Sequence, residues 1–398
     1  MNKKVVTDLD VKSKKVLVRV DFNVPMSKTE IGKILDNKRI VAAIPTIKYL
    51  IENKAKVILL SHLGRPKGEA KKEFSLEPIS KELSNLIKKE VKFIKSSIVV
   101  DENVKKEIEN LKDGQIALLE NTRFRKEETK NIDEFSKELA SLGELYVNDA
   151  FGTSHRAHCS NVGICKYLPS ALGFLVEKEV DIMSNALANP KRPFVAILGG
   201  AKVSDKIMVI ENLIKKVDSI LIGGAMAFTF LKAQGKNIGK SLVEEDKLDI
   251  SLKILENAKK NNVKIILPID VVVSKEFSND SKFFTVDVDK MKDDYIGLDI
   301  GNKTVELFSK EIKNANTVVW NGPMGVFEMS NFSKGTFEIA KALAETSATT
   351  IVGGGDSASA IEKSGYKDKI THISTGGGAS LEFLEGKVLP AIEAISNK

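Results

Sequence analysis

Residues 194–202 read Phe-Val-Ala-Ile-Leu-Gly-Gly-Ala-Lys, a short apolar run that ends in a pair of glycines and a lysine. Apolar side chains then recur at steps of four and three, at positions 203, 207, 210, 214 and 217. This spacing is typical of a helix with one buried face. We therefore expect a strand over 194–198 and a helix that begins directly after Gly199-Gly200. A strand that leads through a glycine turn into a packed helix is the repeating unit of an α/β fold.

Short apolar runs of this kind alternate with amphipathic stretches along the whole chain. In the first half we expect strands at 16–20, 57–60, 91–94, 116–119 and 145–147. In the second half we expect them at 194–198, 219–222, 265–267, 318–320, 350–352 and 370–373. The sequence thus predicts an α/β protein with two separate, doubly wound parallel sheets of the Rossmann-like kind.

Two helices bear on the organisation of the chain. Asp36 is placed to cap a helix in which Pro45 should cause a kink or a break, and whose apolar face comprises Ile40, Ile44, Ile47 and Ile51. Residues 173–188 read as a charged helix that ends near Asn189-Pro190. We expect 173–189 to be an interdomain helix with a hinge, between an N-terminal domain over 1–172 and a C-terminal domain over 190–378.

Composition limits the classes of protein to consider. The chain has 398 residues, 42% of them hydrophobic and 29% charged, which suffices for sizeable cores. No stretch approaches the ~18 consecutive apolar residues of a membrane helix, and the N-terminus lacks the apolar region of a signal peptide. The two cysteines, Cys159 and Cys165, match no zinc or redox spacing and are expected to be free thiols. We expect a soluble, cytoplasmic protein.

Two other functions fit the sequence less well. Lysine and arginine exceed aspartate and glutamate by 61 to 54, a net charge of +7, but no basic stripe is interleaved with aromatic residues as in a nucleic-acid-binding module. A nicotinamide-dependent dehydrogenase would need Gly-x-Gly-x-x-Gly after an early strand, and the first strand here is followed by Asp-Phe-Asn. Residues 235–241 are one residue short of a Walker A motif and are expected to form a loop.

Cationic side chains follow the strands of the first half. Ligands of open α/β sheets lie beyond the carboxyl ends of the strands, so residues that bind a ligand are expected at these positions. They hold Asp21, Asn23, His62, Arg65, Arg123, His155 and Arg156, and Arg39 lies on the helix after the first strand. The planar fork of arginine matches phosphate and carboxylate oxygens. Four arginines at one rim therefore predict a small ligand with several negative charges.

The strands of the second half end in glycines instead. Glycine permits close approach of the main chain, and amides at helix N-termini stabilise phosphate oxygens, so a nucleotide is the expected ligand. Glycine pairs or triplets lie at 199–200, 223–224, 353–355 and 376–378, and Gly322 and Gly325 flank Pro323-Met324. Lys202 and Lys206 are four residues apart and are expected to share one face of the helix start. Asp356 directly follows a glycine run and is the best candidate for holding Mg²⁺.

Six motifs resemble those of the phosphoglycerate kinase family, in the family's order and over essentially the whole chain. They are Arg-Val-Asp-Phe-Asn-Val-Pro at 19–25, Ser-His-Leu-Gly-Arg-Pro at 61–66, Gly-Gly-Ala-Lys-Val at 199–203, Val-Trp-Asn-Gly-Pro at 319–323, Gly-Gly-Gly-Asp at 353–356 and His-Ile-Ser-Thr-Gly-Gly-Gly at 372–378. The resemblance implies a monomeric glycolytic kinase that moves a phosphoryl group between 1,3-bisphosphoglycerate and ADP, giving 3-phosphoglycerate and ATP, with Mg²⁺. It implies neither a nucleic acid nor a membrane as partner.

The resemblance also implies roles for individual residues. Those implied to bind 3-phosphoglycerate are Asp21, Phe22, Asn23, Arg39, His62, Leu63, Gly64, Arg65, Arg123 and Arg156. Those implied to bind the nucleotide are Lys202, Lys206, Gly297, Asn321, Glu328, Gly355, Asp356, Ser357 and Ala358. The transferred group is implied to lie among Arg39, Lys202, Lys206 and the amides of Gly355 and Gly378. The segment 379–398 is implied to return to the N-terminal domain.

The reaction itself makes few demands on side-chain chemistry. The attacking carboxylate is already ionised at neutral pH, so no general base is needed. The reaction needs alignment and neutralisation of the charge that spreads over the phosphoryl oxygens, which we expect Arg39, Lys202 and Lys206 to supply. With the two ligands on different domains, domain closure is expected to bring them together.

Overall fold

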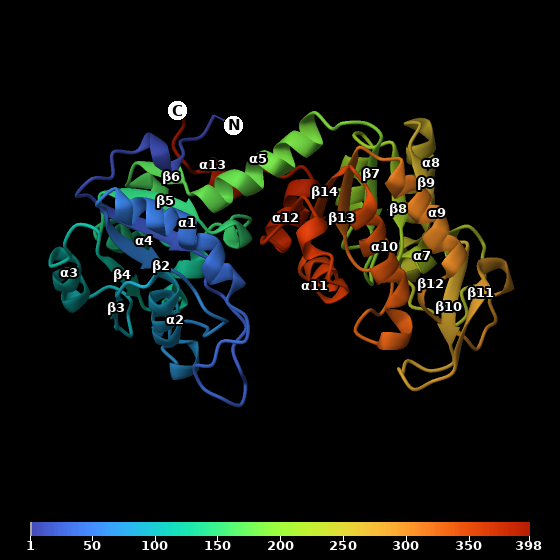
Figure 1. Cartoon of the computed structure of the whole chain (residues 1–398), viewed down its shortest axis with the longest axis horizontal. Coiled ribbons are helices and arrows are strands. Elements are labelled where there is room, and N and C mark those ends of the chain that lie inside the picture. Colours follow the sequence, from blue (N-terminus) through green and yellow to red (C-terminus); the bar gives the residue numbers. More distant parts are fainter. Residues whose placement is uncertain (1) are drawn as a thin grey trace. The chain divides into compact units, whose positions relative to one another are not determined.

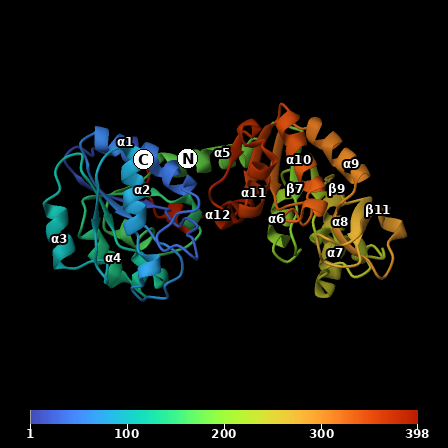
Figure 2. The same ribbon diagram turned by 60° about the horizontal axis from the view of Figure 1, so that its bottom comes forward.

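The computed structural model describes residues 2–398, and the chain forms two compact units (Figures 1 and 2). The first unit contains the residues up to Asp181 together with Val388–Lys398, and the second contains Ile182–Lys387. Of the segment 379–398, residues 379–387 thus belong to the second unit and only the last stretch to the first. No helix formed by residues 2–398 has both the length and the apolar content of a membrane span.

The first unit is built on a six-stranded parallel sheet with the order β3-β4-β2-β1-β5-β6. Its strands are β1 (Lys15–Val20), β2 (Lys56–Leu60), β3 (Val91–Ile94), β4 (Ile116–Leu119), β5 (Leu145–Asp149) and β6 (Ser170–Leu172). The helices between them are α1 (Lys38–Glu52), α2 (Glu77–Ile87), α3 (Glu102–Glu109) and α4 (Asp133–Ala140). The five expected strands are confirmed. The sixth, β6, was not expected, because three residues are too short a run to show a period.

Helix α1 continues through Pro45, so the expectation of a break there is wrong. Proline removes one amide hydrogen bond, but the face formed by Ile40, Ala43, Ile47 and Leu50 is fully buried in the core of the first unit. Burial of these side chains is worth more than one lost hydrogen bond. Asp36 accepts a hydrogen bond at 2.8 Å from the amide of Lys38, the first residue of the helix.

The second unit is built on another six-stranded parallel sheet, with the order β15-β14-β13-β7-β8-β9. Its strands are β7 (Phe194–Leu198), β8 (Ser219–Ile222), β9 (Lys264–Ile266), β13 (Thr317–Asn321), β14 (Thr349–Gly353) and β15 (His372–Ile373). The helices are α6 (Ile207–Leu213), α7 (Met226–Ala233), α8 (Leu248–Lys260), α9 (Asn302–Lys313), α10 (Lys334–Glu345), α11 (Gly355–Ser364) and α12 (Gly378–Leu384). Trp320 on β13 is fully buried at the centre of its core. The predicted α/β class with two parallel sheets is confirmed.

A third, antiparallel sheet of the second unit was not predicted. It has the order β11-β10-β12 and comprises β10 (Asp270–Ser274), β11 (Phe283–Asp287) and β12 (Ile296–Ile300). Val271 and Val273 of β10 pack with Phe228 and Leu231 of α7 in a small core of their own. β11 is largely exposed. In this sheet β12 lies beside the loop that follows β13, because the amide of Val326 in that loop donates to the carbonyl of Leu298 in β12 at 2.9 Å.

Helix α5 (Phe174–Ala188) contains the boundary between the units, and its first turn is fixed within the first unit. The amide of Phe174 donates to Thr46 Oγ1 at 3.0 Å, and the amide of Leu175 donates to Asp149 Oδ1 at 2.9 Å. Asp149 is fully buried at the end of β5, and burial raises its pKa to about 7, against the hydrogen bonds from Thr46 and Leu175 that lower it. A carboxyl group that titrates near neutral pH therefore caps this helix.

Asp149→Asn should change how stability depends on pH. Because the folded-state pKa lies above the unfolded value of 3.8, Asp149 supports folding fully below about pH 3.8, and that support is lost as the pH rises through about 7. The free energy of unfolding of the wild type should therefore fall, relative to the variant, between pH 5 and pH 8. Urea unfolding of both proteins at the two pH values measures this. A constant difference would show that Asp149 does not titrate in this range.

Candidate active site

The order of strands marks where ligands should bind in each unit. In the first sheet β1 lies between β2 and β5, and in the second β7 lies between β13 and β8. At such positions the connections on either side of a strand leave in opposite directions, which opens a crevice beyond its carboxyl end. The loops that follow β1 and β5 in the first sheet, and β7 and β13 in the second, therefore form the expected sites.

Arg39 and Asp21 form the centre of the first cluster. Arg39 Nη1 donates to Asp21 Oδ2 at 2.9 Å and to the carbonyl of Asn23 at 3.2 Å. Asp21 is buried, and its Oδ1 has no hydrogen-bond partner among the described residues, although His62 Nδ1 lies 3.9 Å away. A buried carboxylate oxygen without a donor is costly unless a ligand supplies one. This cluster thus offers a cation and a free acceptor side by side.

The turn at Gly64 joins this cluster to the next arginine. Asn23 Oδ1 accepts a hydrogen bond from the amide of Gly64 at 2.8 Å, and Arg123 Nη1 donates to the carbonyl of the same residue at 2.8 Å. Gly64 has a φ of +60°, and a Cβ there would lie 2.4 Å from the ring of Phe74. Only glycine fits this turn, which links the loop after β1 to the residue that follows β4.

Three of the predicted arginines line one cavity of about 470 Å³ in the first unit. None of the described residues that line it is acidic, and its cationic members are Arg65, Lys67, Arg123, Arg125, Lys126, Lys130 and Arg156. Burial, and then repulsion from Arg19 and Arg156, lowers the pKa of Arg123 to about 10, and its Nε has no partner among the described residues. A buried arginine among several exposed cations favours a multiply charged anion.

The crowding predicts how a ligand stabilises the protein. An anion bound only to the folded state at a hundred times its dissociation constant adds about 2.7 kcal/mol to the free energy of unfolding. Arg123→Met should lose most of the stabilisation that a small, multiply charged anion gives, because the buried guanidinium group is gone. Lys260→Met, which removes an exposed lysine of α8, should retain it. Thermal unfolding with and without ligand measures this, and equal shifts in both variants would count against Arg123 as a ligand.

His62 is held neutral by a residue that the sequence did not single out. Arg19, fully buried in β1, places Nη2 3.0 Å from His62 Nδ1 and donates from Nε to Ser160 Oγ at 2.8 Å. Guanidinium can only donate, so Nδ1 accepts and Nε2 carries the proton. Burial, with repulsion from Arg19, lowers the pKa of His62 well below its usual value. Arg19 is the first residue of the motif at 19–25, but it was given no role, because it lies inside a strand rather than beyond a strand end.

Phe22 and Leu63 are part of the predicted substrate segments, but their side chains are buried in the core of the first unit. Only their main-chain atoms face the loops. The amide of Phe22 donates to Ser61 Oγ at 2.9 Å, which ties the end of β1 to the end of β2.

The glycine turns of the second unit are joined to one another through the main chain. The amides of Gly199 and Gly200 donate at 3.0 Å to the carbonyls of Asn321 and Pro323, respectively. A Cβ on Gly199 would lie 2.1 Å from the carbonyl oxygen of Pro323. The amide of Gly224 donates at 3.0 Å to the carbonyl of Met324. The loops after β7, β8 and β13 therefore form one surface that tolerates no side chains at these points.

The expected helix directly after Gly199-Gly200 is wrong, since α6 begins only at Ile207. Gly200 has a φ of +106°, Val203 is fully buried, and the amide of Lys206 closes a turn onto its carbonyl at 2.8 Å. This turn buries Val203 before the helix begins. Lys202 and Lys206 therefore do not share a helical face. Lys202 is exposed, whereas Lys206 is half-buried and donates to Asn321 Oδ1.

Burial lowers the pKa of Lys206, although nearby carboxylates oppose this effect. Its partner Asn321 donates from Nδ2 to the carbonyl of Gly353 at 3.0 Å. The amide of Gly322 donates to Ser357 Oγ at 2.6 Å, which ties the β13 loop to the first turn of α11. Lys206 thus belongs to a network that spans the ends of β13 and β14, rather than to a free surface.

A pocket of about 210 Å³ opens beside this network, and we call it the glycine pocket. Three predicted nucleotide residues line it, namely Gly297, Glu328 and Asp356, together with Gly200, Gly224 and Asp299. A Cβ on Gly297 would lie 2.0 Å from the ring of Phe228. Gly355 and Asp356 are exposed in the first turn of α11, Ala358 is half-buried there, and Gly378 is the exposed first residue of α12.

The metal expectation rests on Asp356 alone. Within residues 2–398 no group of three or more histidine, cysteine or acidic side chains is placed to hold a metal ion. Mg²⁺ in nucleotide sites is commonly held by one or two carboxylates and completes its shell with phosphate oxygens and water. An exposed carboxylate on the rim of the glycine pocket fits that arrangement.

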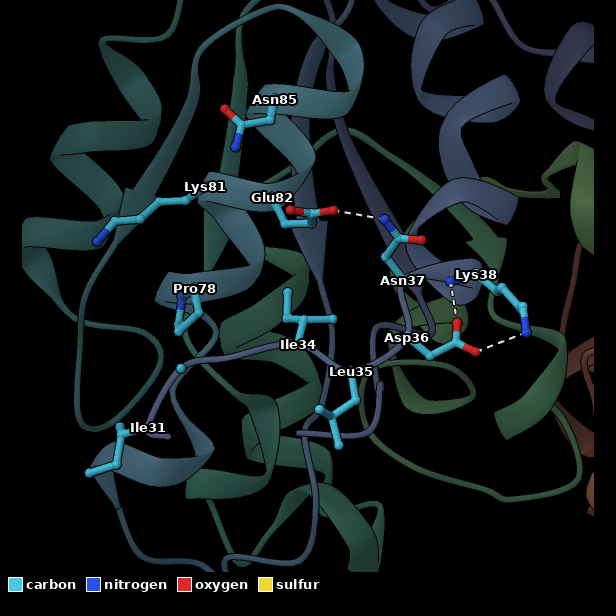
Figure 3. A pocket seen from close by; sticks show the side chains of 11 residues that line it. Ile31, Ile34, Leu35, Asp36, Asn37, Lys38, Pro78, Lys81, Glu82 and Asn85 are labelled. Atoms are coloured by element: carbon cyan, nitrogen blue, oxygen red, sulfur yellow. Dashed lines mark hydrogen bonds and ion pairs between the residues drawn. The ribbon is translucent and has the colours of Figure 1, made fainter. Parts of the chain in front are cut away.

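A wider cavity, of about 800 Å³, lies between the loop 31–38 and α2 in the first unit (Figure 3). It contains none of the predicted site residues. Figure 3 shows Asn37 beside Glu82 and Asp36 beside Lys38. Asn37 Nδ2 donates to Glu82 Oε1 at 2.7 Å, and Lys38 Nζ lies 3.0 Å from Asp36 Oδ2. The charged groups of this cavity thus have partners within the protein, so its large volume alone is no evidence of a ligand site.

Residues 235–241, which nearly match the Walker A motif, form a loop as expected.

The family model for phosphoglycerate kinase matches residues 6–387. The chain belongs to the phosphoglycerate kinase family. The phosphoglycerate kinase of Finegoldia magna is 64% identical over 398 residues, with all of both chains covered, and that of Clostridium kluyveri is 58% identical, covering 100% of this chain and 99% of the relative. The structure of phosphoglycerate kinase from Coxiella burnetii matches with a TM-score of 0.90 at 44% identity, covering 98% of both chains.

Membership of the family makes this chain a kinase of glycolysis that acts on small molecules and uses ATP and ADP. A second solved structure, the phosphoglycerate kinase from Pyrococcus horikoshii, matches with a TM-score of 0.85 at 35% identity over 98% of both chains. The predicted family, fold class and activity are confirmed. The individual site residues remain predictions.

Proposed function

We propose that 3-phosphoglycerate binds to the first unit, at the cluster and cavity around Asp21, Arg39 and Arg123. The single observation that carries this proposal is a cavity without lining acids whose Arg123 is linked through the main chain of Gly64 to Asn23. The same loop as Asn23 holds Asp21, whose buried Oδ1 has no hydrogen-bond partner among the described residues. A phosphate and a carboxylate match the arginines, and the hydroxyl group of the ligand would donate to Asp21 Oδ1. The full set comprises Asp21, Asn23, Arg39, His62, Arg65, Arg123 and Arg156, with the main chain of Phe22, Leu63 and Gly64.

The nucleotide is proposed to bind to the second unit at the glycine pocket. Gly297 and Glu328 would face its base and ribose, and Lys202, Lys206 and Asn321 its phosphates, with the amides of Gly355, Ser357 and Ala358 at the start of α11. Amides at a helix N-terminus stabilise phosphate oxygens. Asp356 would hold Mg²⁺, which would neutralise charge on the phosphate chain and orient it.

The transfer is proposed to be direct and in line. His62 is neutral and buried, so it would orient the substrate through Nε2–H and not move a proton. Arg39 would neutralise charge on the transferring group, together with Lys202, Lys206 and the amides of Gly355 and Gly378. No side chain is proposed to accept the phosphoryl group. Arg39 and Lys206 are each held by hydrogen bonds within their own unit, to Asp21 and Asn321, and a donor fixed in advance lowers a barrier more than a mobile one.

A coupled assay tests the proposed function. The purified protein would be incubated with 3-phosphoglycerate and magnesium ATP, the acyl phosphate would be drained by reduction, and loss of NADH would be followed. Turnover that requires every component is expected. No turnover by a folded protein that still binds ATP would overturn the proposal.

Ligand-induced compaction is a further expectation. The carboxylate oxygen must approach the phosphorus in line, yet the residues proposed for the two ligands belong to different units. Closure around a hinge near α5 would bring the ligands together and exclude water. Small-angle scattering should show a smaller radius of gyration with both ligands than with either one. An unchanged radius with both bound would contradict closure.

We also propose that the protein acts as a monomer in the cytoplasm. One chain supplies the proposed residues for both ligands, so the reaction has no need of a second copy. Sedimentation at assay concentration would test the oligomeric state.

A further inference from the structure

Asp299, near the end of β12, lines the glycine pocket but takes no part in the proposed contacts with the nucleotide. Only 4% of this residue is exposed. Its Oδ1 accepts a hydrogen bond from the amide of Ile300 at 2.9 Å, and its Oδ2 accepts one from the amide of Gly335 at 2.7 Å. Gly335 is the second residue of α10, whose N-cap residue Ser333 makes no capping hydrogen bond with its side chain. The carboxyl group thus joins β12 to the start of α10.

The same carboxyl group also supports the loop that follows β13. A Cβ on Gly325 would lie 2.2 Å from Asp299 Oδ1, and one on Gly335 would lie 2.4 Å from it, so Asp299 is in close contact with both glycines. The loop has a second tie to α10, since the amide of Met324 donates to the buried Thr336 Oγ1 at 3.0 Å. Asp299 and Thr336 therefore fix the two sides of one short turn.

This turn separates two of the residues proposed to bind the nucleotide. Asn321 lies before it and Glu328 after it, and Glu328 lines the same pocket as Asp299. We propose that Asp299 is a positioning residue for the nucleotide, which it need not touch, because its carboxyl group holds the 321–328 loop at the correct distance from β12. The inference rests on the proposed nucleotide site and adds to it a residue that sets nucleotide affinity.

Asp270 offers a matched control in the neighbouring strand β10. It is 2% exposed, and its Oδ1 accepts from the amide of Thr304 at 2.8 Å while Oδ2 accepts from the amide of Lys303 at 3.0 Å. Asp270 thus accepts hydrogen bonds from the first turn of α9, as Asp299 does from the first turn of α10. Gly301 is in close contact with Asp270, as Gly325 and Gly335 are with Asp299. Asp270 is not among the described residues that line the glycine pocket.

The experiment compares Asp299→Asn with Asp270→Asn in the full-length protein, by Tm and by the KM for each of the two substrates. Asparagine keeps the shape but turns one acceptor into a donor that faces another N–H group. Both variants should lose stability. Only Asp299→Asn should raise the KM for ATP, by about tenfold, the usual effect of leaving one buried N–H group without its acceptor. The KM for the acceptor substrate, 3-phosphoglycerate, should stay within about twofold in both variants.

An equal change, or none, in the KM for ATP of the two variants would overturn the proposal and leave Asp299 a purely structural residue. If Asp299→Asn does not fold, Thr336→Val tests the proposal instead. This variant removes only the hydrogen bond from the amide of Met324 to Thr336 Oγ1 and preserves the shape of the side chain. It should raise the KM for ATP by about threefold, and an unchanged KM would reject the proposal. Titration of wild-type protein with ADP tests the nucleotide site separately from the role of Asp299. If ADP does not bind, the proposed nucleotide site itself is refuted.

Discussion

Arg39→Ala should lower kcat by about 10²- to 10³-fold, the usual cost of removing one preorganised donor at a site of developing charge. Arg39 is fixed by Asp21 Oδ2 and the carbonyl of Asn23, so its guanidinium group is already in place before substrate binds. It also lies in the first turn of α1, which contains no acidic residue and where the helix dipole favours an anion. Steady-state kinetics with both substrates at saturation measure the effect.

Lys38→Ala is the matched control, because Lys38 precedes Arg39 in the same helical turn and pairs with Asp36. It should retain at least half of the wild-type kcat. Arg39→Lys should recover only part of the loss, since a point charge cannot replace a planar fork. A kcat of Arg39→Ala close to that of the wild type would remove Arg39 from the transfer step and leave it, at most, a substrate ligand.

Lys206→Met should lower kcat/KM for ATP by about 10²-fold or more. Lys206 is half-buried and bonded to Asn321, so its ammonium group is desolvated and acts more strongly on a phosphate than an exposed lysine would. The variant keeps the length of the side chain but leaves Asn321 Oδ1 without its donor. Kinetics with varied ATP at fixed, saturating 3-phosphoglycerate measure the effect.

Lys215→Met, an exposed position just beyond α6, is the control for the loss of one charge. It should change kcat/KM by less than about twofold. If Lys206→Met behaved like this control, the phosphates would not be bound by the network at the ends of β13 and β14. The glycine pocket would then not be the nucleotide site.

The parallel sheets could be predicted because their strands are buried on both faces and give unbroken apolar runs. Phe194–Leu198 is fully buried and was predicted to its last residue. The antiparallel sheet could not, since the residues of β11 face solvent and include Thr285 and Asp287. The start of α6 was misplaced for another reason. Val203 fits the helical period and is buried, but it lies in the turn before α6. Periodicity cannot distinguish a residue buried by a turn from one buried on the face of a helix.

The candidate site was predictable where it depends on strand ends. Asp21, Arg123 and Asn321 lie beside the ends of β1, β4 and β13, where the sequence placed them. What the sequence could not show is how these side chains are joined. The link from Asn23 to Arg123 passes through the main chain of Gly64, and Asp299 acts on a loop more than twenty residues away in the chain. Such links depend on tertiary distances, which no local pattern encodes.

Direct transfer between the two bound ligands can be followed by rapid quench, with ATP labelled in its γ-phosphoryl group. Wild-type protein in excess over the nucleotide would be mixed with 3-phosphoglycerate and Mg²⁺ and quenched within one turnover. Direct transfer predicts that label leaves ATP and enters the acyl phosphate at the same rate, with none bound to the protein. Label that appears first on the protein, or that never reaches 3-phosphoglycerate, would contradict a site that works by charge neutralisation alone.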